Sequence, residues 1–530
     1  MTKGYVSIIL HSHMPFIRHP EIEDALEERW LFEAISESYI PLIDVYDNLL
    51  KDNINFKITM SITPTLMTML EDGYINERYL QYLNKSIELS EKEMLRTRDN
   101  VEINKLSQFY NERFNKLKFI YTSYDCNLMN AFRKFDRAGC LEIITSSATH
   151  SFLPLLTINP ETVKAQIATG IQSYIDFMGH SPKGIWLPEC AYTYSIDSIL
   201  KEYGIQYFIS ESKAILNASP KPRYGTYAPI ANQNGVCIFA RDIESSYQVW
   251  SDFTGYPGDF NYREFYRDVG YELPMEYIKP YINKDGIRVD TGIKYYKVTG
   301  KTDNKEYYNR DNAINKAKEH ANHFANCRRH QINHISKHME QPAIITCPYD
   351  TELFGHWWFE GPDFIDALIR KSSEEGMNYD LITPAEYLNM HPIVQCSSPS
   401  PSSWGENGDF SVWLNPSNHW IYKELHKCAD AMIRLANIYP NATDIQRRAL
   451  NQAARELMLA EASDWPFIIK NNTTVDYAVR QVNVHLERFN RLYEDIMKNS
   501  IDLKYVSFIE SLDNIFKNVD YKIYTKSSQY

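Results

Sequence analysis

The sequence predicts an α/β protein whose core is an open or closed barrel of parallel strands. Short apolar runs rich in β-branched and aromatic residues recur along the chain, and helical segments separate them. Strands that alternate with helices pair in parallel, and about seven of them are enough for an α/β barrel. The seven expected strands are residues 5–10, 57–62, 141–145, 184–187, 206–210, 236–240 and 343–346.

Two kinds of segment depart from this alternation. Long, charge-patterned stretches predict helical insertions into the barrel at about 76–119 and 260–340. The Ser- and Pro-rich segment 395–407 indicates a domain boundary, and the chain beyond it carries apolar residues at helical spacing. We therefore expect a catalytic barrel at 1–395 and a C-terminal helical domain at 396–530.

The charge and composition disfavour several kinds of partner. A net charge of -12 is unsuited to nucleic acid, which needs a basic surface, and to an anionic membrane surface. No stretch approaches the roughly 18 apolar residues that span a bilayer, and the N-terminus shows no signal-peptide cleavage site. The eight cysteines are widely spaced without a CxxC pair, which indicates buried, reduced thiols. We expect a cytoplasmic protein and a monomer.

Polar, titratable side chains follow several predicted strands at the point where each strand ends. His11 and His13 follow the first strand, and His150 lies just beyond the third. Glu189 follows the fourth strand, and Asp350 follows the last. Because α/β barrels build their active sites at the carboxyl ends of the strands, we expect these side chains to converge.

The two carboxyls lie in matching aromatic surroundings. Glu189 lies in GIWLPECAY and Asp350 in CPYDTELFGHWW. Cleavage of a glycosidic bond uses two such groups, because one attacks the anomeric carbon and the other protonates the leaving oxygen. Apolar surroundings exclude water and raise the pKa of the acid. A single carboxyl is more often a helix cap or an arginine partner, but the matched pair makes catalysis an equal alternative.

The pair His11 and His13 has two interpretations. Alternate residues of a strand point the same way, so the pair could bind a metal with His150 and Asp350 as further ligands. It could equally donate hydrogen bonds to sugar hydroxyls beside the nucleophile. The spacing alone leaves both interpretations open.

Trp404 and Trp413 lie in the segment SSWGENGDFSVWLNP, among Gly, Asn and Pro. A tryptophan in such a loop is less often a core residue than one in a periodic helix, so we interpret both as sugar platforms, with simple packing as the alternative. Aromatic residues make up 13% of the chain, which fits a carbohydrate-binding protein and a large core alike. Asp464, in AEASDWPF, interrupts a helix and could belong to a packed turn.

Taken together, these motifs resemble glycoside hydrolase family 57, and within it the group of 1,4-α-glucan branching enzymes. The resemblance runs nearly end to end and implies a distorted (β/α)7 barrel with helical insertions and a C-terminal helical domain that contributes to a glucan cleft. The segments that carry it are HSHMPFIRHPE, EERWLFEAISESYIPLI, TSSATHSFLPLL, GIWLPECAY, VWSDFTGYPGDFNYREFYRDVGY, DGIRVDTGIKYYKVTG, YDTELFGHWWFEGP, SDWPF and DNIFKNVDYKIY.

The resemblance also implies roles for particular residues. Glu189 would be the nucleophile and Asp350 the general acid/base of a retaining enzyme that uses no metal or other cofactor. The group also has a tyrosine on a mobile loop, for which Tyr224 and Tyr247 are candidates. The residues implied to bind substrate are His11, His13, Trp30, His150, Arg263, Trp404, Trp413 and Asp464.

The implied activity is cleavage of an α-1,4 linkage and transfer of the released chain to O6 of a second glucan, which creates an α-1,6 branch. An α-1,4-glucan, such as amylose or a glycogen-like polymer, would be both donor and acceptor. An α-amylase or a 4-α-glucanotransferase would use the same two carboxyls. A catalytically silent glucan-binding protein is a further alternative.

Overall fold

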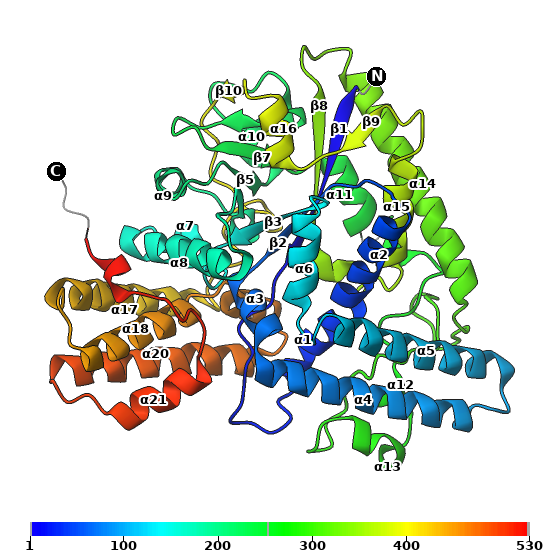
Figure 1. The fold of residues 1–530 in the computed structure, drawn as a ribbon, viewed down its shortest axis with the longest axis horizontal. Helices are drawn as coiled ribbons and strands as arrows, with labels where there is room; N and C mark the ends of the chain where they lie inside the picture. The colour runs from blue at the N-terminus through cyan, green and yellow to red at the C-terminus, as the bar shows by residue number, and fades with distance from the viewer. Residues whose placement is uncertain (1–2, 252–253, 527–530) are drawn as a thin grey trace.

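The computed structural model describes residues 3–251 and 254–526 and has the expected α/β fold (Figure 1). Seven parallel strands form the core, and each coincides with a run that the sequence predicts as a strand. The first strand is buried along its whole length, as expected where helices cover both faces of a sheet. The strands are β1 (Gly4–Ser12), β2 (Ile58–Ile62), β3 (Leu141–Ser146), β4 (Gly184–Trp186), β5 (Tyr207–Ser210), β7 (Cys237–Ala240) and β8 (Ala343–Asp350).

The sheet has the order β7-β5-β4-β3-β2-β1-β8 and curls until its two ends meet. Just beyond β7, the backbone N–H of Asp242 donates to the carbonyl of Thr346 in β8 at 2.9 Å. This contact lies where a regular barrel would have a continuous ladder, so the barrel is distorted. Three short strands extend the sheet: β6 (Ile230–Ala231) beside β7, β10 (Gln395–Cys396) beside β6, and β9 (Tyr379–Leu381) beside β1.

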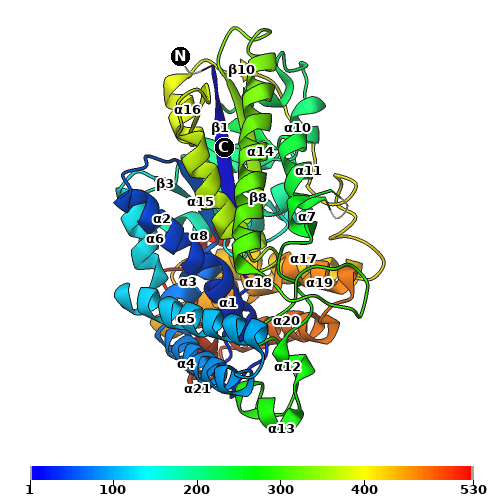
Figure 2. The same ribbon diagram turned by 90° about the vertical axis from the view of Figure 1, so that its right-hand side faces the viewer.

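Helices cover the outside of the barrel (Figure 1, Figure 2). One of them, η1 (Ile35–Tyr39), is a single π-helical stretch between α1 and α2. The covering helices are α1 (Glu28–Ala34), α2 (Ile40–Lys51), α3 (Pro64–Glu71), α6 (Leu128–Arg137), α7 (Leu153–Leu156), α8 (Pro160–Met178), α9 (Ile196–Glu202), α10 (Ser212–Leu216), α11 (Ile243–Trp250), α14 (Arg310–Ile335), α15 (Gly361–Ser372) and α16 (Pro384–Met390).

The first insertion is a helical hairpin rather than the single helical stretch that the charge pattern indicates. It consists of α4 (Gly73–Arg96) and α5 (Val101–Ser123), which project from the barrel (Figure 1). A new helix begins at Val101, because the side chain of the preceding Asn100 accepts the N–H of Ile103 and so caps the first turn of α5. The second expected insertion, about 260–340, contains the short helices α12 (Val269–Glu272) and α13 (Met275–Ile278), the 3-10 helix η5 (Lys279–Tyr281) and the long helix α14.

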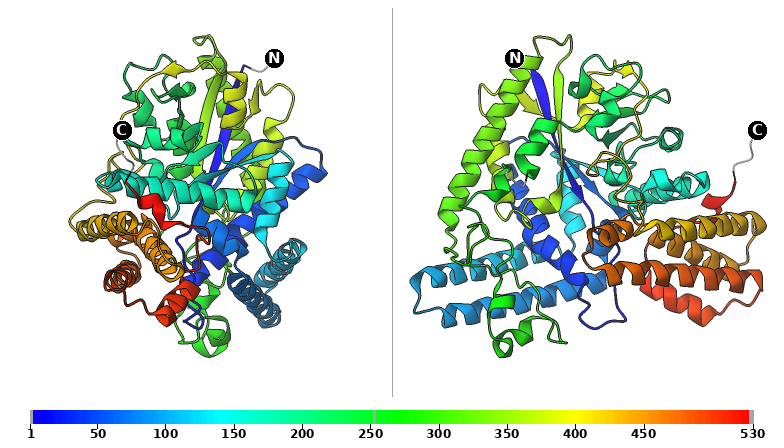
Figure 3. Two further views of the ribbon diagram at one scale, coloured as in Figure 1. Left: turned by 60° about the vertical axis from the view of Figure 1, so that its left-hand side comes forward. Right: turned by 180° about the vertical axis from the view of Figure 1, so that it is seen from behind.

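The C-terminal domain is a helical bundle at the end of the barrel toward which β1 runs (Figure 1, Figure 3). The turn between α18 and α19 contacts the barrel directly, since Ser151 and Ala462 form an antiparallel bridge. The backbone N–H of Ser463 also donates to the His150 carbonyl at 3.1 Å. The bundle comprises α17 (His419–Ile438), α18 (Asp444–Ala460), α19 (Asp464–Asn471), α20 (Val475–Met497) and α21 (Leu503–Leu512).

All eight cysteines lie within the described residues and are free thiols, as predicted. Their expected burial holds for Cys140, Cys190, Cys347 and Cys428. Cys396 is exposed because it lies on the short edge strand β10. Among the helices of the described ranges, none combines the length and the apolar character needed to cross a membrane.

Candidate active site

A cavity of about 480 Å³ lies at the carboxyl ends of the barrel strands. Glu189 and Asp350 both line it, and so do His11, His13 and His150. The structure therefore brings together the side chains that the strand ends place on one edge of the sheet. The other lining residues are Arg241, Trp250, Glu352, Trp357, Trp404, Asp464 and Phe467.

Glu189 lies in a tight turn just after β4. Its φ of 60° is left-handed, which is uncommon for a residue other than glycine and is often found at functional sites. The carboxylate Oε2 accepts the indole N–H of Trp404 at 2.8 Å, and Oε1 accepts the hydroxyl of Ser463 at 3.3 Å. The backbone N–H of Trp404 also donates to the Glu189 carbonyl at 3.0 Å. Residues beyond the barrel thus hold Glu189 in place.

The two carboxyls have different electrostatic surroundings. Burial raises the pKa of Glu189 to about 7, although the hydrogen bond from Trp404 favours the ionised form. Burial also raises the pKa of Asp350 well above its usual value, and the negative charges of Glu352 and Glu189 add to this shift. The hydrogen bond to Glu189 opposes the shift that burial causes, whereas the neighbouring charges add to the shift of Asp350, and such a difference is typical of a nucleophile paired with an acid.

His11 and His150 form a chain of hydrogen bonds that ends at Glu189. His11 Nδ1 lies 3.1 Å from Ser61 Oγ, and His11 Nε2 lies 3.0 Å from His150 Nε2. His150 Nδ1 lies 2.8 Å from Ser463 Oγ. Because Ser463 donates its proton to Glu189, it accepts from His150, whose Nε2 then accepts from His11. Burial lowers the pKa of both histidines well below its usual value, so both rings are neutral and this chain determines their tautomers.

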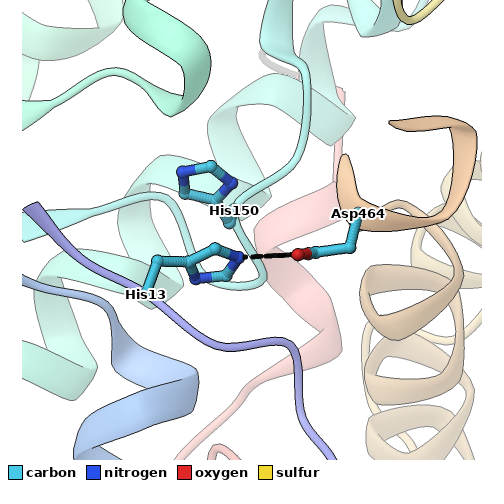
Figure 4. Close-up of side chains that lie close together, drawn as sticks. All are labelled: His13, His150 and Asp464. Carbon is cyan, nitrogen blue, oxygen red and sulfur yellow. Dashed lines mark hydrogen bonds and ion pairs between the residues drawn. The ribbon is translucent and has the colours of Figure 1, made fainter. Parts of the chain in front are cut away.

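The pKa of His13 shifts in the opposite direction. Its Nε2 lies 3.1 Å from the carboxylate of Asp464, at the start of α19 (Figure 4). Burial by itself would lower the pKa of His13, but the Asp464 carboxylate outweighs that effect and the pKa is raised. The pair connects the first barrel strand to the C-terminal domain across the cavity.

The metal alternative can be judged from His13, His150 and Asp464, whose potential ligand atoms lie within 4.8 Å of one another. The two imidazole rings stack face to face, with centroids 3.8 Å apart and planes 17° apart (Figure 4). Histidine ligands direct lone pairs in the ring plane at one ion about 2.0–2.1 Å away. Stacked rings direct these lone pairs side by side, so the geometry favours hydrogen bonding over metal binding.

Three residues implied by the resemblance lie outside the cavity. Trp413 is 1% exposed and stacks on Phe152 at a centroid distance of 4.5 Å, so it packs in the interior and offers no open face to a sugar. Trp30 is half-buried and packs edge-on against the C-terminal domain. Arg263 is buried in an ion pair with Glu37 at 2.8 Å.

Five cavity residues received no role from the sequence. Arg241 could have been found, because it directly follows β7 as other site residues follow their strands. Glu352 and Trp357 stand in the same motif as Asp350, but the motif does not show which of its side chains face the cavity. No local pattern distinguishes the remaining two, Trp250 and Phe467.

The two candidate loop tyrosines lie in different places. Tyr224 lines a separate groove with Pro222 and Met390. Tyr247 is 60% exposed on α11, one turn before the cavity residue Trp250. Tyr247 is therefore the candidate that lies nearer the site.

Comparison with known proteins identifies the family. Residues 7–397 match the model of glycosyl hydrolase family 57. The chain belongs to this family. Residues 424–524 in addition match the model for the C-terminal region of 1,4-alpha-glucan branching enzymes, so the family 57 barrel is followed by a branching-enzyme type of helical domain.

Several family 57 relatives resemble the chain over its full length. A 1,4-alpha-glucan branching enzyme of Thermococcus kodakarensis is 31% identical over 98% of this chain and 78% of its own, and its crystal structure superposes with a TM-score of 0.90. A branching enzyme of Pyrococcus horikoshii is 32% identical, covering 99% and 97% of the two chains with a TM-score of 0.89. An alpha-amylase of Thermotoga maritima is 42% identical over the whole of both chains, with a TM-score of 0.94.

Proposed function

We propose that the chain is a 1,4-α-glucan branching enzyme, which cleaves an α-1,4 linkage and transfers the released chain to O6 of another glucan. The observation that carries this proposal is how the C-terminal domain completes the site. The region that matches the branching-enzyme model supplies Ser463 to Glu189 and Asp464 to His13. These contacts make that region part of the cavity that holds both carboxyls.

Glu189 is the nucleophile in this proposal. The bond from Trp404 to Oε2 is 2.8 Å long, whereas the bond from Ser463 to Oε1 is 3.3 Å and therefore weaker. Oε1 is thus the oxygen freer to attack the anomeric carbon. Both hydrogen bonds stabilise the carboxylate, which is the form that attacks. In the glycosyl-enzyme, Oε1 becomes the ester oxygen and Oε2 the carbonyl oxygen.

Asp350 is the general acid and base. Its raised pKa keeps it protonated before cleavage, so it can protonate the glycosidic oxygen as Glu189 attacks. The deprotonated Asp350 then accepts the proton of the acceptor O6 hydroxyl, which attacks the glycosyl-enzyme. Two displacements at one carbon retain the α configuration, and this mechanism uses carboxyls about 5–5.5 Å apart.

Transfer requires that a sugar hydroxyl reach the intermediate before water does. The cavity favours sugars over water, because Trp250, Trp357, Trp404 and Phe467 all line it. The second candidate function is α-amylase activity, since the 42% identical Thermotoga maritima relative bears that name. In both functions Glu189 attacks the anomeric carbon. The functions differ in the molecule that then attacks the glycosyl-enzyme, which is a sugar hydroxyl in branching and water in hydrolysis.

The test is incubation with amylose, followed by proton NMR of the linkages and an assay of reducing ends. New α-1,6 signals with few new reducing ends support branching. Rising reducing ends without α-1,6 signals would overturn it in favour of hydrolysis. The Glu189→Gln variant is the control, and it should give neither signal. A wild-type chain that binds amylose but changes neither signal would be a glucan-binding protein.

A further inference from the structure

The loop after Asp350 carries an exposed aromatic side chain that takes no direct part in either displacement step. Trp357 is 56% exposed and lines the cavity, whereas its neighbour Trp358 is 1% exposed and belongs to the core. A large aromatic side chain usually gains stability by burial, so one left open beside two catalytic carboxyls calls for an explanation.

One face of the Trp357 ring is stacked on another aromatic ring. Phe265 stacks on one face at a centroid distance of 4.5 Å, with the planes 18° apart. The ammonium of Lys294 lies 4.6 Å from the centre of the Phe265 ring. His356 packs edge-on to both aromatic rings, at 5.5 Å from Trp357 and 5.4 Å from Phe265. These contacts hold the ring in place, and Trp357 at the same time lines the cavity.

The loop that carries Trp357 rests on the π-helix η1. Single π-helical turns are rare and frequently occur at functional sites. The hydroxyl of Tyr39 donates a short hydrogen bond to the Glu352 carboxylate, and Glu37 accepts one from His356 Nδ1 at 2.7 Å. Gly355 packs so closely here that a Cβ would lie 1.8 Å from the Glu37 carbonyl oxygen. The residues on both sides of this glycine are thus fixed by η1.

Arg263 completes this support. It forms a buried ion pair with Glu37 at 2.8 Å. Burial alone would raise the pKa of Glu37, but Arg263 and His356 hold it well below its usual value, so Glu37 stays ionised. The chain from Arg263 through Glu37 to His356 fixes the residue that precedes Trp357. Arg263 therefore acts on the site through other residues and does not touch the cavity itself.

We propose that Trp357 is a stacking platform for a glucan chain that extends from the point of cleavage. This inference rests on the proposed action on α-1,4-glucans and adds a binding position to it. The apolar face of a glucose unit covers an aromatic ring and removes both surfaces from water. A ring that Phe265 and His356 already hold in place loses little conformational freedom when a sugar binds.

The test measures binding of maltoheptaose by titration calorimetry in the Glu189→Gln background, where the chain is not cleaved. Adding Trp357→Ala should weaken binding about tenfold, which corresponds to about 1.4 kcal/mol. Adding Trp357→Phe keeps an aromatic face and should restore most of the affinity. Adding Phe119→Ala is the matched control, because Phe119 is 71% exposed on α5 but lies outside the cavity lining, and it should leave binding unchanged.

Kinetics on amylose separates binding from chemistry. In the active enzyme, Trp357→Ala should raise KM while kcat stays close to that of the wild type. Unchanged maltoheptaose affinity in a folded Trp357→Ala variant would overturn the proposal that Trp357 is a stacking platform. A Glu189→Gln parent that binds no maltoheptaose would overturn it as well. Weakened binding in the variant without α-1,6 products from the wild type would support the platform and refute branching.

Discussion

The hydrogen bond from Trp404 Nε1 to Glu189 Oε2 favours the ionised form of the proposed nucleophile, and Trp404→Phe removes this bond while leaving an aromatic ring in place. A hydrogen bond to a charged group contributes about 1.5–3 kcal/mol. At 1.36 kcal/mol for each pKa unit, its loss corresponds to about one to two units. Because the bond favours the carboxylate, its loss raises the pKa of Glu189 above the value of about 7 that it has in the intact site.

The pH dependence of kcat/KM on amylose measures this shift, since it reports the groups of the free enzyme. In Trp404→Phe we expect the acidic side of the kcat/KM profile, here called the acid limb, to move to higher pH by about one to two pH units. At pH 6 the ionised fraction of Glu189, and with it kcat/KM, should fall by about 10- to 100-fold. The difference in kcat/KM between the variant and the wild type should become smaller as the pH rises through the new pKa of Glu189.

Trp413→Phe is the matched control, because it makes the same change nine positions along the same segment. The indole N–H of Trp413 has no hydrogen-bond partner within the described part of the chain, so its removal should leave the acid limb in place. An unmoved acid limb in Trp404→Phe would refute the account of Glu189. An equal movement in both variants would refute it too, since the effect would then come from disturbed packing.

Three further predictions follow from the site. Ser463→Ala removes the longer bond to Glu189, so the acid limb should move in the same direction but less than in Trp404→Phe; a downward movement would contradict this. Gly355→Ala should lower the melting temperature, because φ is 122° and the added Cβ would meet the Glu37 carbonyl; an unchanged melting temperature would argue against that contact. Exhaustive chelation should leave activity on amylose unchanged, because the stacked histidines are poorly placed for a metal; loss of activity that Zn²⁺ restores would contradict it.

The sequence predicts the parts of the fold that depend on the pattern of neighbouring residues. Each barrel strand is a continuous apolar run, and α17 lies in the C-terminal part of the chain where apolar residues recur at helical spacing. The break between α4 and α5 was missed, because Asn100 caps the second helix inside an otherwise continuous charge pattern. Convergence of Glu189 and Asp350 follows from a general property of barrels, that strand ends meet at one edge.

Contacts between distant segments could not be predicted in this way. The burial of Trp413 depends on Phe152, which lies in the barrel and far away in the sequence. The bond between Glu37 and His356 joins positions 319 residues apart, and each residue looks like an ordinary surface charge in its own segment. Such pairs become visible only once the chain is folded.

The contacts of Trp404, Ser463 and Asp464 with the barrel have a consequence for the synthesis of the protein. A nascent chain that ends before residue 396 already carries Glu189 and Asp350, but it lacks the donors that hold Glu189 and the carboxylate that pairs with His13. The cavity therefore gains its full set of contacts only after the last quarter of the polypeptide has been synthesised and has folded against the barrel.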